Sequence, residues 1–160
     1  MTGIFIVGNS RSGTTMMARI LGNNPNVFSF RELHFFEELC SAPDLYKSLP
    51  SKKREELFAR LIAVQRQGYM LVRSIDQRYL NEAHAVLPST GVENSIGVYA
   101  AYLVYETKLQ KKSIPCEQTP RNLQYLDEIL TYYKDDVRVV AMLRDPRDIL
   151  LSQKRKWRRK

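Results

Sequence analysis

Runs of apolar residues along the chain predict strands and helices in alternation. Residues 4–7 (Ile-Phe-Ile-Val) are continuously apolar, as in a strand that is covered on both faces. A loop rich in glycine and serine follows, and apolar residues then recur at helical spacing between Met16 and Leu21. Gly22 and the Asn-Asn-Pro sequence after it predict the end of that helix. We expect a second short helix within residues 32–40.

The middle of the chain contains one clear helical pattern and a longer ambiguous stretch. Residues 51–67 predict a helix with Ser51 as its N-cap and Gly68 at its end. Its apolar stripe consists of Leu57, Leu61, Ile62 and Val64. Residues 98–109 also have helical spacing, whereas the rest of residues 69–112 follows no single period.

Alternation of strand and helix returns in the last third of the chain. Residues 113–118 predict an extended segment, and Thr119-Pro120 predicts the cap and first position of a helix that includes residues 123–133. Residues 137–143 predict a buried strand, and Pro146 begins a final helix. This order indicates an α/β protein, with a three-layer parallel sheet and helices on both faces. We expect residues 1–160 to form a single domain.

The composition is that of a globular chain and says little about partners. Hydrophobic residues make up 44% of the 160 residues and charged residues 26%, which argues against a disordered chain. The net charge of +8 suggests an anionic partner, but six of the 25 Lys and Arg residues lie within Lys154–Lys160. Residues 1–153 therefore carry 19 basic and 17 acidic side chains, so the protein is not broadly basic.

The sequence shows no membrane span, no signal peptide and no cysteine motif. No apolar run approaches the roughly 20 residues that cross a bilayer, and no signal peptide precedes the first strand. The two cysteines, Cys40 and Cys116, are too few for a disulfide framework and lack the spacing of a metal site. We therefore expect a reduced, cytoplasmic domain.

Gly8 and Gly13 frame a loop between the first predicted strand and helix, with the spacing of a phosphate-binding loop. Backbone N–H groups and the helix N-terminus converge on an anion in such loops. Nucleoside triphosphatases have a lysine directly after the second glycine. Here Thr14 stands at that position, and the cation, Arg11, lies two residues before Gly13. A simple tight turn is the alternative, and the sequence Arg-Ser-Gly-Thr-Thr makes it the weaker one.

The segment 6–15 resembles the 5′-phosphosulfate loop of sulfotransferases that use 3′-phosphoadenosine 5′-phosphosulfate (PAPS), in which Lys or Arg lies two residues before the glycine. The resemblance implies a fold like that of P-loop nucleoside triphosphatases and transfer of a sulfuryl group from PAPS to a hydroxyl or amine acceptor. It also implies that Arg11 reaches the 5′-phosphate and the bridging oxygen, where negative charge develops. The residues that would hold the 5′-phosphate are Ser12, Gly13, Thr14 and Thr15. No divalent metal is expected, because PAPS has no β,γ-polyphosphate to neutralise.

A second candidate phosphate site follows the strand predicted at residues 137–143. Arg144 stands at the end of this strand, where ligands collect in a doubly wound sheet, and Ser152 lies on the next helix. The same sulfotransferases have a 3′-phosphate motif in which Arg and Ser are separated by eight positions. The resemblance therefore assigns Arg144 and Ser152 to the 3′-phosphate. A local Arg144–Asp145 ion pair and an exposed serine are the alternatives.

A candidate base lies in the segment 31–36 (Arg-Glu-Leu-His-Phe-Phe). This segment resembles one in heparan sulfate sulfotransferases, where a glutamate followed by x-His-Phe-Phe supplies the base that accepts the acceptor's proton. By position, Glu32 is the base, His34 is a supporting polar residue near the acceptor, and Glu37 matches an acidic residue of that group. The alternatives are an exposed first-turn carboxylate for Glu32 and a structural histidine for His34.

The resemblance covers about half of the chain, residues 4–37 and 114–153. Residues 117–120 (Glu-Gln-Thr-Pro) are similar to a Glu-Lys-Thr-Pro segment, but Gln118 replaces the lysine, which weakens the case for a highly anionic polysaccharide acceptor. Residues 38–113 contain no recognisable motif of the family, in which the corresponding region helps to form the acceptor pocket. Relatives continue past the 3′-phosphate helix, so we expect either a domain truncated at its C-terminus or a reduced version with an incomplete cofactor site.

Two other functions stay open beside sulfuryl transfer. A P-loop kinase for a small metabolite would need the lysine that Thr14 replaces and a magnesium-binding Asp, for which Asp145 is the candidate. A nucleic-acid-binding domain is suggested by Lys154–Lys160, where six cations surround Trp157. We favour a solvated, basic helix end for that segment. The expected partners are thus PAPS and a hydroxyl- or amine-bearing acceptor, without nucleic acid.

Overall fold

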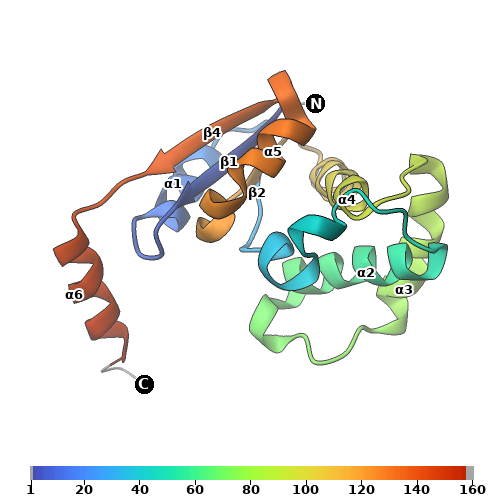
Figure 1. Cartoon of the computed structure of the whole chain (residues 1–160), viewed down its shortest axis with the longest axis horizontal. Coiled ribbons are helices and arrows are strands. Elements are labelled where there is room, and N and C mark those ends of the chain that lie inside the picture. Colours follow the sequence, from blue (N-terminus) through green and yellow to red (C-terminus); the bar gives the residue numbers. More distant parts are fainter. Residues whose placement is uncertain (1, 158–160) are drawn as a thin grey trace.

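The strands of the protein form a parallel sheet whose carboxyl ends gather at one edge. The computed structural model describes the backbone of residues 2–157 and the side chains of residues 2–155. Within that backbone, four parallel strands pair in the order β2-β3-β1-β4. They are β1 (Gly3–Gly8), β2 (Val27–Ser29), β3 (Ile114–Glu117) and β4 (Val137–Met142). The parallel arrangement brings the ends of β1, β3 and β4 to the same side of the sheet (Figure 1).

Helices cover the sheet and extend away from it. The α-helices are α1 (Thr14–Gly22), α2 (Ser51–Gln67), α3 (Gln77–Val86), α4 (Ser95–Leu109), α5 (Leu126–Tyr133) and α6 (Pro146–Trp157). Short 3-10 segments lie at Ala42–Asp44, Tyr69–Leu71, Leu87–Thr90, Pro120–Tyr125 and Lys134–Asp136, and a π-helical turn at Phe35–Leu39. Figure 1 shows α2, α3 and α4 grouped together, with α6 beyond the end of β4 on the other side of the molecule.

The central strand β1 is buried on both faces, which explains its continuous run of apolar residues. Ile6 faces one layer and packs with Ala18 of α1 and with Cys116 of β3. Phe5 and Val7 face the opposite layer, where they join the larger core formed with α2, α4 and α5. The predicted α/β class with helices on both faces of a parallel sheet is therefore confirmed.

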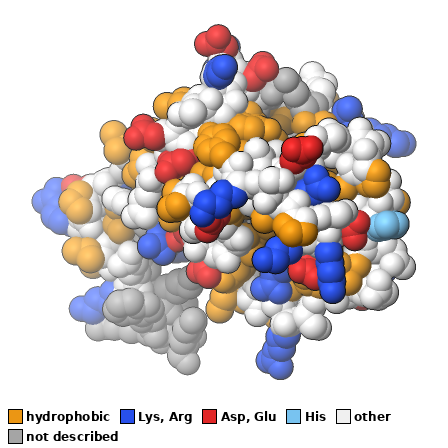
Figure 2. Space-filling model, turned by 45° about the vertical axis from the view of Figure 1, so that its right-hand side comes forward, with side chains coloured by type: hydrophobic (Ala, Val, Ile, Leu, Met, Phe, Trp, Pro, Cys, Tyr) orange, Lys and Arg blue, Asp and Glu red, His pale blue; other side chains and the backbone are white. Residues whose placement is uncertain are grey.

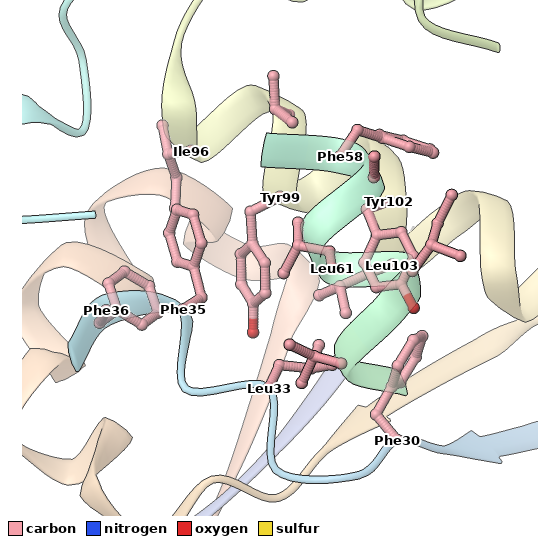
Figure 3. Packing of buried hydrophobic residues seen from close by; sticks show 14 of the residues in the cluster. Phe30, Leu33, Phe35, Phe36, Phe58, Leu61, Ile96, Tyr99, Tyr102 and Leu103 are labelled. Atoms are coloured by element: carbon pink, nitrogen blue, oxygen red, sulfur yellow. The ribbon is translucent and has the colours of Figure 1, made fainter. Parts of the chain in front are cut away.

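Aromatic side chains in the larger core attach the segment after β2 to the helices. The rings of Phe35 and Tyr99 stack with their centroids 4.2 Å apart, and Phe36 stacks on Tyr125 at 5.3 Å. Leu33 lies in the same cluster and is fully buried (Figure 3). Each fully buried side chain of this size contributes about 1.5–3 kcal/mol. The polar residues on either side of Leu33 are consequently held at a defined position.

The predicted helix at residues 51–67 is confirmed, but its N-cap is different. Pro50 is the N-cap, because Ser51 already has helical geometry and its hydroxyl donates to Glu55 Oε1 at 3.4 Å. The ambiguous stretch contains α3, whose first turn donates to the side chain of Asp76. The helix predicted from residue 98 begins at Ser95 instead, because the side chain of Asn94 caps it.

The prediction of a buried strand at residues 137–143 is wrong in its burial. Val137 is buried, but the other residues of β4 are partly or fully exposed, and Leu143 beyond it is 93% exposed. Within residues 2–157 β4 pairs only with β1, so it is an edge strand there. An apolar run alone does not distinguish an edge strand from a central one.

Two predicted helices are shorter than expected. The segment 32–40 contains only the π-helical turn Phe35–Leu39. The helix expected to follow Thr119 begins as the 3-10 segment Pro120–Tyr125 and becomes α-helical only at Leu126.

Candidate active site

The loop between β1 and α1 has a backbone that only particular residues permit. Gly8 has φ +150°, and a Cβ placed on it would lie 2.5 Å from the carbonyl oxygen of Met142 in β4. Gly13, the N-cap of α1, has φ +103°, and Arg11 between them has φ +73°. The amide of Ser12 donates to the carbonyl of Asn9 at 3.0 Å. The glycine spacing seen in the sequence therefore corresponds to a tight turn that leads directly into a helix N-terminus.

This loop forms the wall of a cavity of about 510 Å³. The cavity is lined by residues 10–16, Glu32, Pro120, Arg144 and Ser152. The first turn of α1 carries no acidic side chain and no side-chain cap, so its N–H groups are available to an anion. The hydroxyl oxygen of Ser12 is buried and has no hydrogen-bond partner within the described residues. These groups fit a phosphate, because such a ligand would satisfy donors that are otherwise unpaired.

The cations of the two predicted phosphate sites meet in this cavity. Arg11 Nε donates to Ser152 Oγ at 3.0 Å, and one terminal nitrogen of Arg144 donates to the backbone carbonyl of Arg11 at 3.2 Å. Arg144 Nε also lies 3.9 Å from a carboxylate oxygen of Asp148. The alternative considered for Arg144, an ion pair with Asp145, is not found, because Asp145 pairs with Arg147 at 2.6 Å instead. Residues from the beginning and the end of the chain thus form one basic site.

Glu32 connects this cavity with a second one of about 560 Å³. The second cavity is lined by Arg31, Glu32, His34, Glu37, Glu38, Gln67, Gly68, Tyr69, Met70, Leu71 and Arg121. The side chain of Glu32 is 40% exposed, so its carboxylate is accessible to a molecule bound in either cavity. A base at this position can reach an acceptor on one side and a phosphate-bound donor on the other.

His34 is held between two carboxylates. Its Nε2 lies 3.5 Å from Glu32 Oε2, and its Nδ1 lies 2.9 Å from Glu37 Oε2. The contact with Glu32 raises the pKa of His34 to about 9, with Glu37 adding to the effect and burial opposing it. The imidazole is therefore protonated at neutral pH and acts as a cation beside Glu32. Arg121 in turn pairs with Glu37 Oε1 at 2.5 Å.

Two parts of this arrangement were not predicted from the sequence. The ion pair of Arg121 with Glu37 joins residues far apart in the chain. Thr119 is the N-cap residue of the 3-10 segment Pro120–Tyr125, as predicted, but its side chain does not cap that segment. Its Oγ1 accepts hydrogen bonds from the amides of Leu33 (3.0 Å) and His34 (3.3 Å). Its place just after β3, at the edge where strand ends gather, is the signal that could have indicated this role.

Metal ligands, membrane spans and the basic C-terminal segment were also compared with the described part of the chain. Among the described residues, no group of three or more His, Cys, Asp or Glu side chains is arranged to hold a metal. No helix of the described part of the chain is long and apolar enough to cross a membrane. The basic segment Lys154–Lys160 lies partly outside the described residues, since nothing is described of the side chains of residues 156–160. On the face drawn in Figure 2, basic side chains are interspersed with acidic and apolar ones.

A glycine-framed loop, a helix N-terminus and strand-end arginines are the features with which α/β proteins bind phosphorylated ligands. The sequence model of the sulfotransferase family matches residues 3–160, so the chain belongs to that family and is a transferase. This assignment favours sulfuryl transfer over the kinase alternative. Comparisons with curated proteins and with solved structures found no match.

Proposed function

We propose that the enzyme transfers the sulfuryl group of PAPS to a hydroxyl or amine group of an acceptor. The observation that carries this proposal is the cavity in which Arg11, Ser152 and Arg144 surround the loop while Glu32 forms the wall toward a second cavity. PAPS carries one phosphate at the 3′ position of its ribose and another at the 5′ position. Residues of both predicted phosphate sites line that cavity.

The loop and its cation would hold the 5′-phosphate. Ser12 offers an unpaired buried hydroxyl, and the amides of Gly13, Thr14 and Thr15 lie at the free N-terminus of α1. Arg11 carries the positive charge nearest to this turn. As the bond from sulfur to the bridging oxygen breaks, the electron pair stays on the phosphate, and a fixed guanidinium stabilises that charge.

Arg144 and Ser152 would hold the 3′-phosphate. Ser152 Oγ accepts a hydrogen bond from Arg11 Nε. A phosphate oxygen can replace Oγ as the acceptor of that hydrogen bond, or it can accept a hydrogen bond from the serine hydroxyl. Arg144 is anchored to the loop backbone at Arg11, which fixes its distance from the 5′-phosphate site.

Glu32 would accept the proton of the acceptor as the new bond to sulfur forms. Protonated His34 beside it stabilises the carboxylate and carries positive charge toward the transferred group. The second cavity, on the far side of Glu32, would contain the acceptor.

Calorimetric titration tests the donor assignment. Adenosine 3′,5′-bisphosphate is compared with adenosine 5′-phosphate and with ATP, for the wild type, Arg144→Gln and Arg147→Gln. Loss of a charge-assisted hydrogen bond of about 1.5–3 kcal/mol predicts that Arg144→Gln weakens binding of the bisphosphate about 10- to 100-fold and leaves adenosine 5′-phosphate unaffected. Arg147 is a matched control, because it is 86% exposed and pairs with Asp145.

Two outcomes would contradict the proposal. Equal affinity for the nucleotides with and without a 3′-phosphate overturns the assignment of Arg144 and Ser152, and tightest binding of ATP favours a kinase. Turnover is followed as release of adenosine 3′,5′-bisphosphate from PAPS with a mixture of hydroxyl and amine acceptors. Glu32→Gln should abolish turnover while nucleotide affinity stays at the wild-type level.

A further inference from the structure

A buried carboxylate stands at the carboxyl end of β3, next to the proposed site. Glu117 is 1% exposed, and its carboxylate accepts four hydrogen bonds. In each of them the partner group is the donor. Oε1 receives the amide of Leu33 at 3.3 Å and the hydroxyl of Thr119 at 2.5 Å. Oε2 receives the amide of Thr119 at 3.0 Å and the side-chain amide of Asn122. An ion buried this completely is costly, so its retention requires a role that an apolar residue would not fill.

The partners of this carboxylate include the backbone of the segment that carries the proposed base. Thr119 Oγ1 accepts the amides of both Leu33 and His34 while it donates its own proton to Glu117. Glu32 directly precedes these two anchored residues. The end of β3 thereby fixes a stretch of chain that lies more than 80 residues away in sequence.

The backbone of this segment needs such an anchor. His34 has φ +53°, a left-handed conformation that non-glycine residues adopt rarely and that persists only where the surroundings enforce it. Leu33, between Glu32 and His34, is fully buried in the aromatic core (Figure 3). Its two neighbours, Glu32 and His34, both line the second cavity. A buried side chain and two anchored amides together determine where the Glu32 carboxylate lies.

We propose that Glu117, acting through Thr119, is a positioning residue for sulfuryl transfer, because its carboxylate fixes the backbone of residues 33 and 34 and so holds Glu32 between the two cavities. This inference rests on the proposed role of Glu32 as base. It assigns a task in the reaction to a buried acidic group that touches neither phosphate site.

The network works only while Glu117 is charged. A protonated carboxyl would direct its own O–H at partners that are already donors, so at least one anchoring hydrogen bond would be lost. Burial raises the pKa of Glu117 to about 7, although hydrogen bonds from Thr119 and Leu33 and the charge of His34 lower it. The proton is therefore taken up as the pH falls through neutrality, and the segment carrying Glu32 loosens.

The other titratable groups that face Glu117 keep their charge over the same interval. His34 stays protonated below its pKa of about 9. Burial raises the pKa of Cys116 to about 12 and those of Tyr99 and Tyr133 well above the ordinary value, so these three remain neutral. Of these facing groups, Glu117 alone changes its charge near pH 7.

Thr119→Val and Thr119→Ser form the matched pair that tests the role. Valine has the shape of threonine without the hydroxyl, whereas serine keeps it. We expect Thr119→Val to lower kcat about 10²-fold, the cost of a displacement of about 1 Å at a reacting group. The acidic limb of its pH profile should move to higher pH, because a hydrogen bond that lowers the pKa of Glu117 is lost. Thr119→Ser should restore both quantities, and the affinity for adenosine 3′,5′-bisphosphate should stay at the wild-type level in both variants.

A second measurement needs no variant. The backbone amide resonances of Leu33 and His34 in the wild-type protein are followed by NMR from pH 5.5 to pH 8.5 with the nucleotide bound. We expect both to shift with a midpoint at about pH 7, the pKa of Glu117. Amide resonances that do not move over this interval would overturn the proposal even where Thr119→Val fails to fold.

The outcomes separate this inference from the function on which it rests. If Glu32→Gln is inactive and Thr119→Val has the wild-type kcat and pH profile, only the positioning role is wrong. If Glu32→Gln is fully active, the proposed base is wrong and the positioning role falls with it.

Discussion

The charge of His34 should make the stability of the protein depend on pH in a defined direction. The perturbation is His34→Gln, which keeps a polar side chain of similar reach but removes the imidazolium between Glu32 and Glu37. A histidine whose pKa is higher in the folded state than in the unfolded state stabilises the fold below its unfolded pKa. That contribution is lost as the pH rises through the folded pKa. Here the interval runs from 6.5 to about 9.

The size of the effect follows from the two pKa values. The difference between 6.5 and about 9 corresponds to about 3 kcal/mol at about 1.4 kcal/mol for each pH unit. The side chain is 23% exposed and one of its partners, Glu32, is 40% exposed, so screening by solvent reduces the expected value to about 2 kcal/mol. Below pH 6.5 the free energy of unfolding of the wild type should exceed that of His34→Gln by this amount. Above pH 9.5 this charge-dependent difference should be absent.

Urea unfolding of both proteins at several pH values between 6 and 10 measures this difference directly. Subtraction removes the titration of the shared groups that do not interact with His34. His84→Gln is the control, because it removes the other histidine, whose side chain is 77% exposed beside Glu55. A difference between wild type and His34→Gln that stays constant with pH would refute the reasoning, since it would show that His34 is not charged by its two carboxylates.

Two further substitutions test packing and buried charge. Gly8→Ala should lower the free energy of unfolding by about 3 kcal/mol in urea titrations. The reason is that its Cβ would lie 2.5 Å from the backbone oxygen of Met142, at a φ of +150°. An unchanged unfolding midpoint would contradict this prediction. Arg66→Ala should cost about 3 kcal/mol, since Arg66 neutralises Glu106, whose side chain is 3% exposed. Arg78→Ala removes an exposed cation and should leave the unfolding midpoint unchanged. A comparable loss of stability in both arginine variants would contradict the role of burial.

The local elements of the fold were largely predictable because they depend on short-range patterns. The run at residues 4–7, the two glycines after it and the spacing of apolar residues in α1 and α2 each reflect the geometry of a few neighbouring residues. The same applies to the loop between β1 and α1, whose backbone angles at Gly8 and Gly13 require glycine. One error concerns burial, as in β4, because burial depends on which elements lie alongside. The others concern helix ends and lengths, as at residues 32–40 and at the N-cap of α2.

The candidate site was predictable in part through a rule that links sequence to space. Parallel strands bring their carboxyl ends to one edge, so Arg144, just after a strand, was expected to bind an anion together with Ser152. The resemblance to PAPS-dependent sulfotransferases assigned Arg11 to the other phosphate of the same ligand. The structure brings Arg11 and Arg144 into contact in one cavity. The hydrogen bond between Arg11 and Ser152 also forms at this edge of the sheet and joins residues that are 141 positions apart.

Sequence alone determined that this chain is an α/β protein with a glycine-framed loop between its first strand and helix, since periodicity and loop glycines express constraints between adjacent residues. Its similarity to sulfotransferases also pointed to Glu32 and His34. Only the tertiary structure decided what surrounds them: the carboxylates on both sides of His34, the ion pair of Arg121 and the buried Glu117 that anchors the segment through Thr119. The Arg121–Glu37 ion pair and the hydrogen bonds that Glu117 and Thr119 accept from residues 33 and 34 join residues more than 80 positions apart. A contact over that separation depends on how strands and helices pack, which no local pattern encodes.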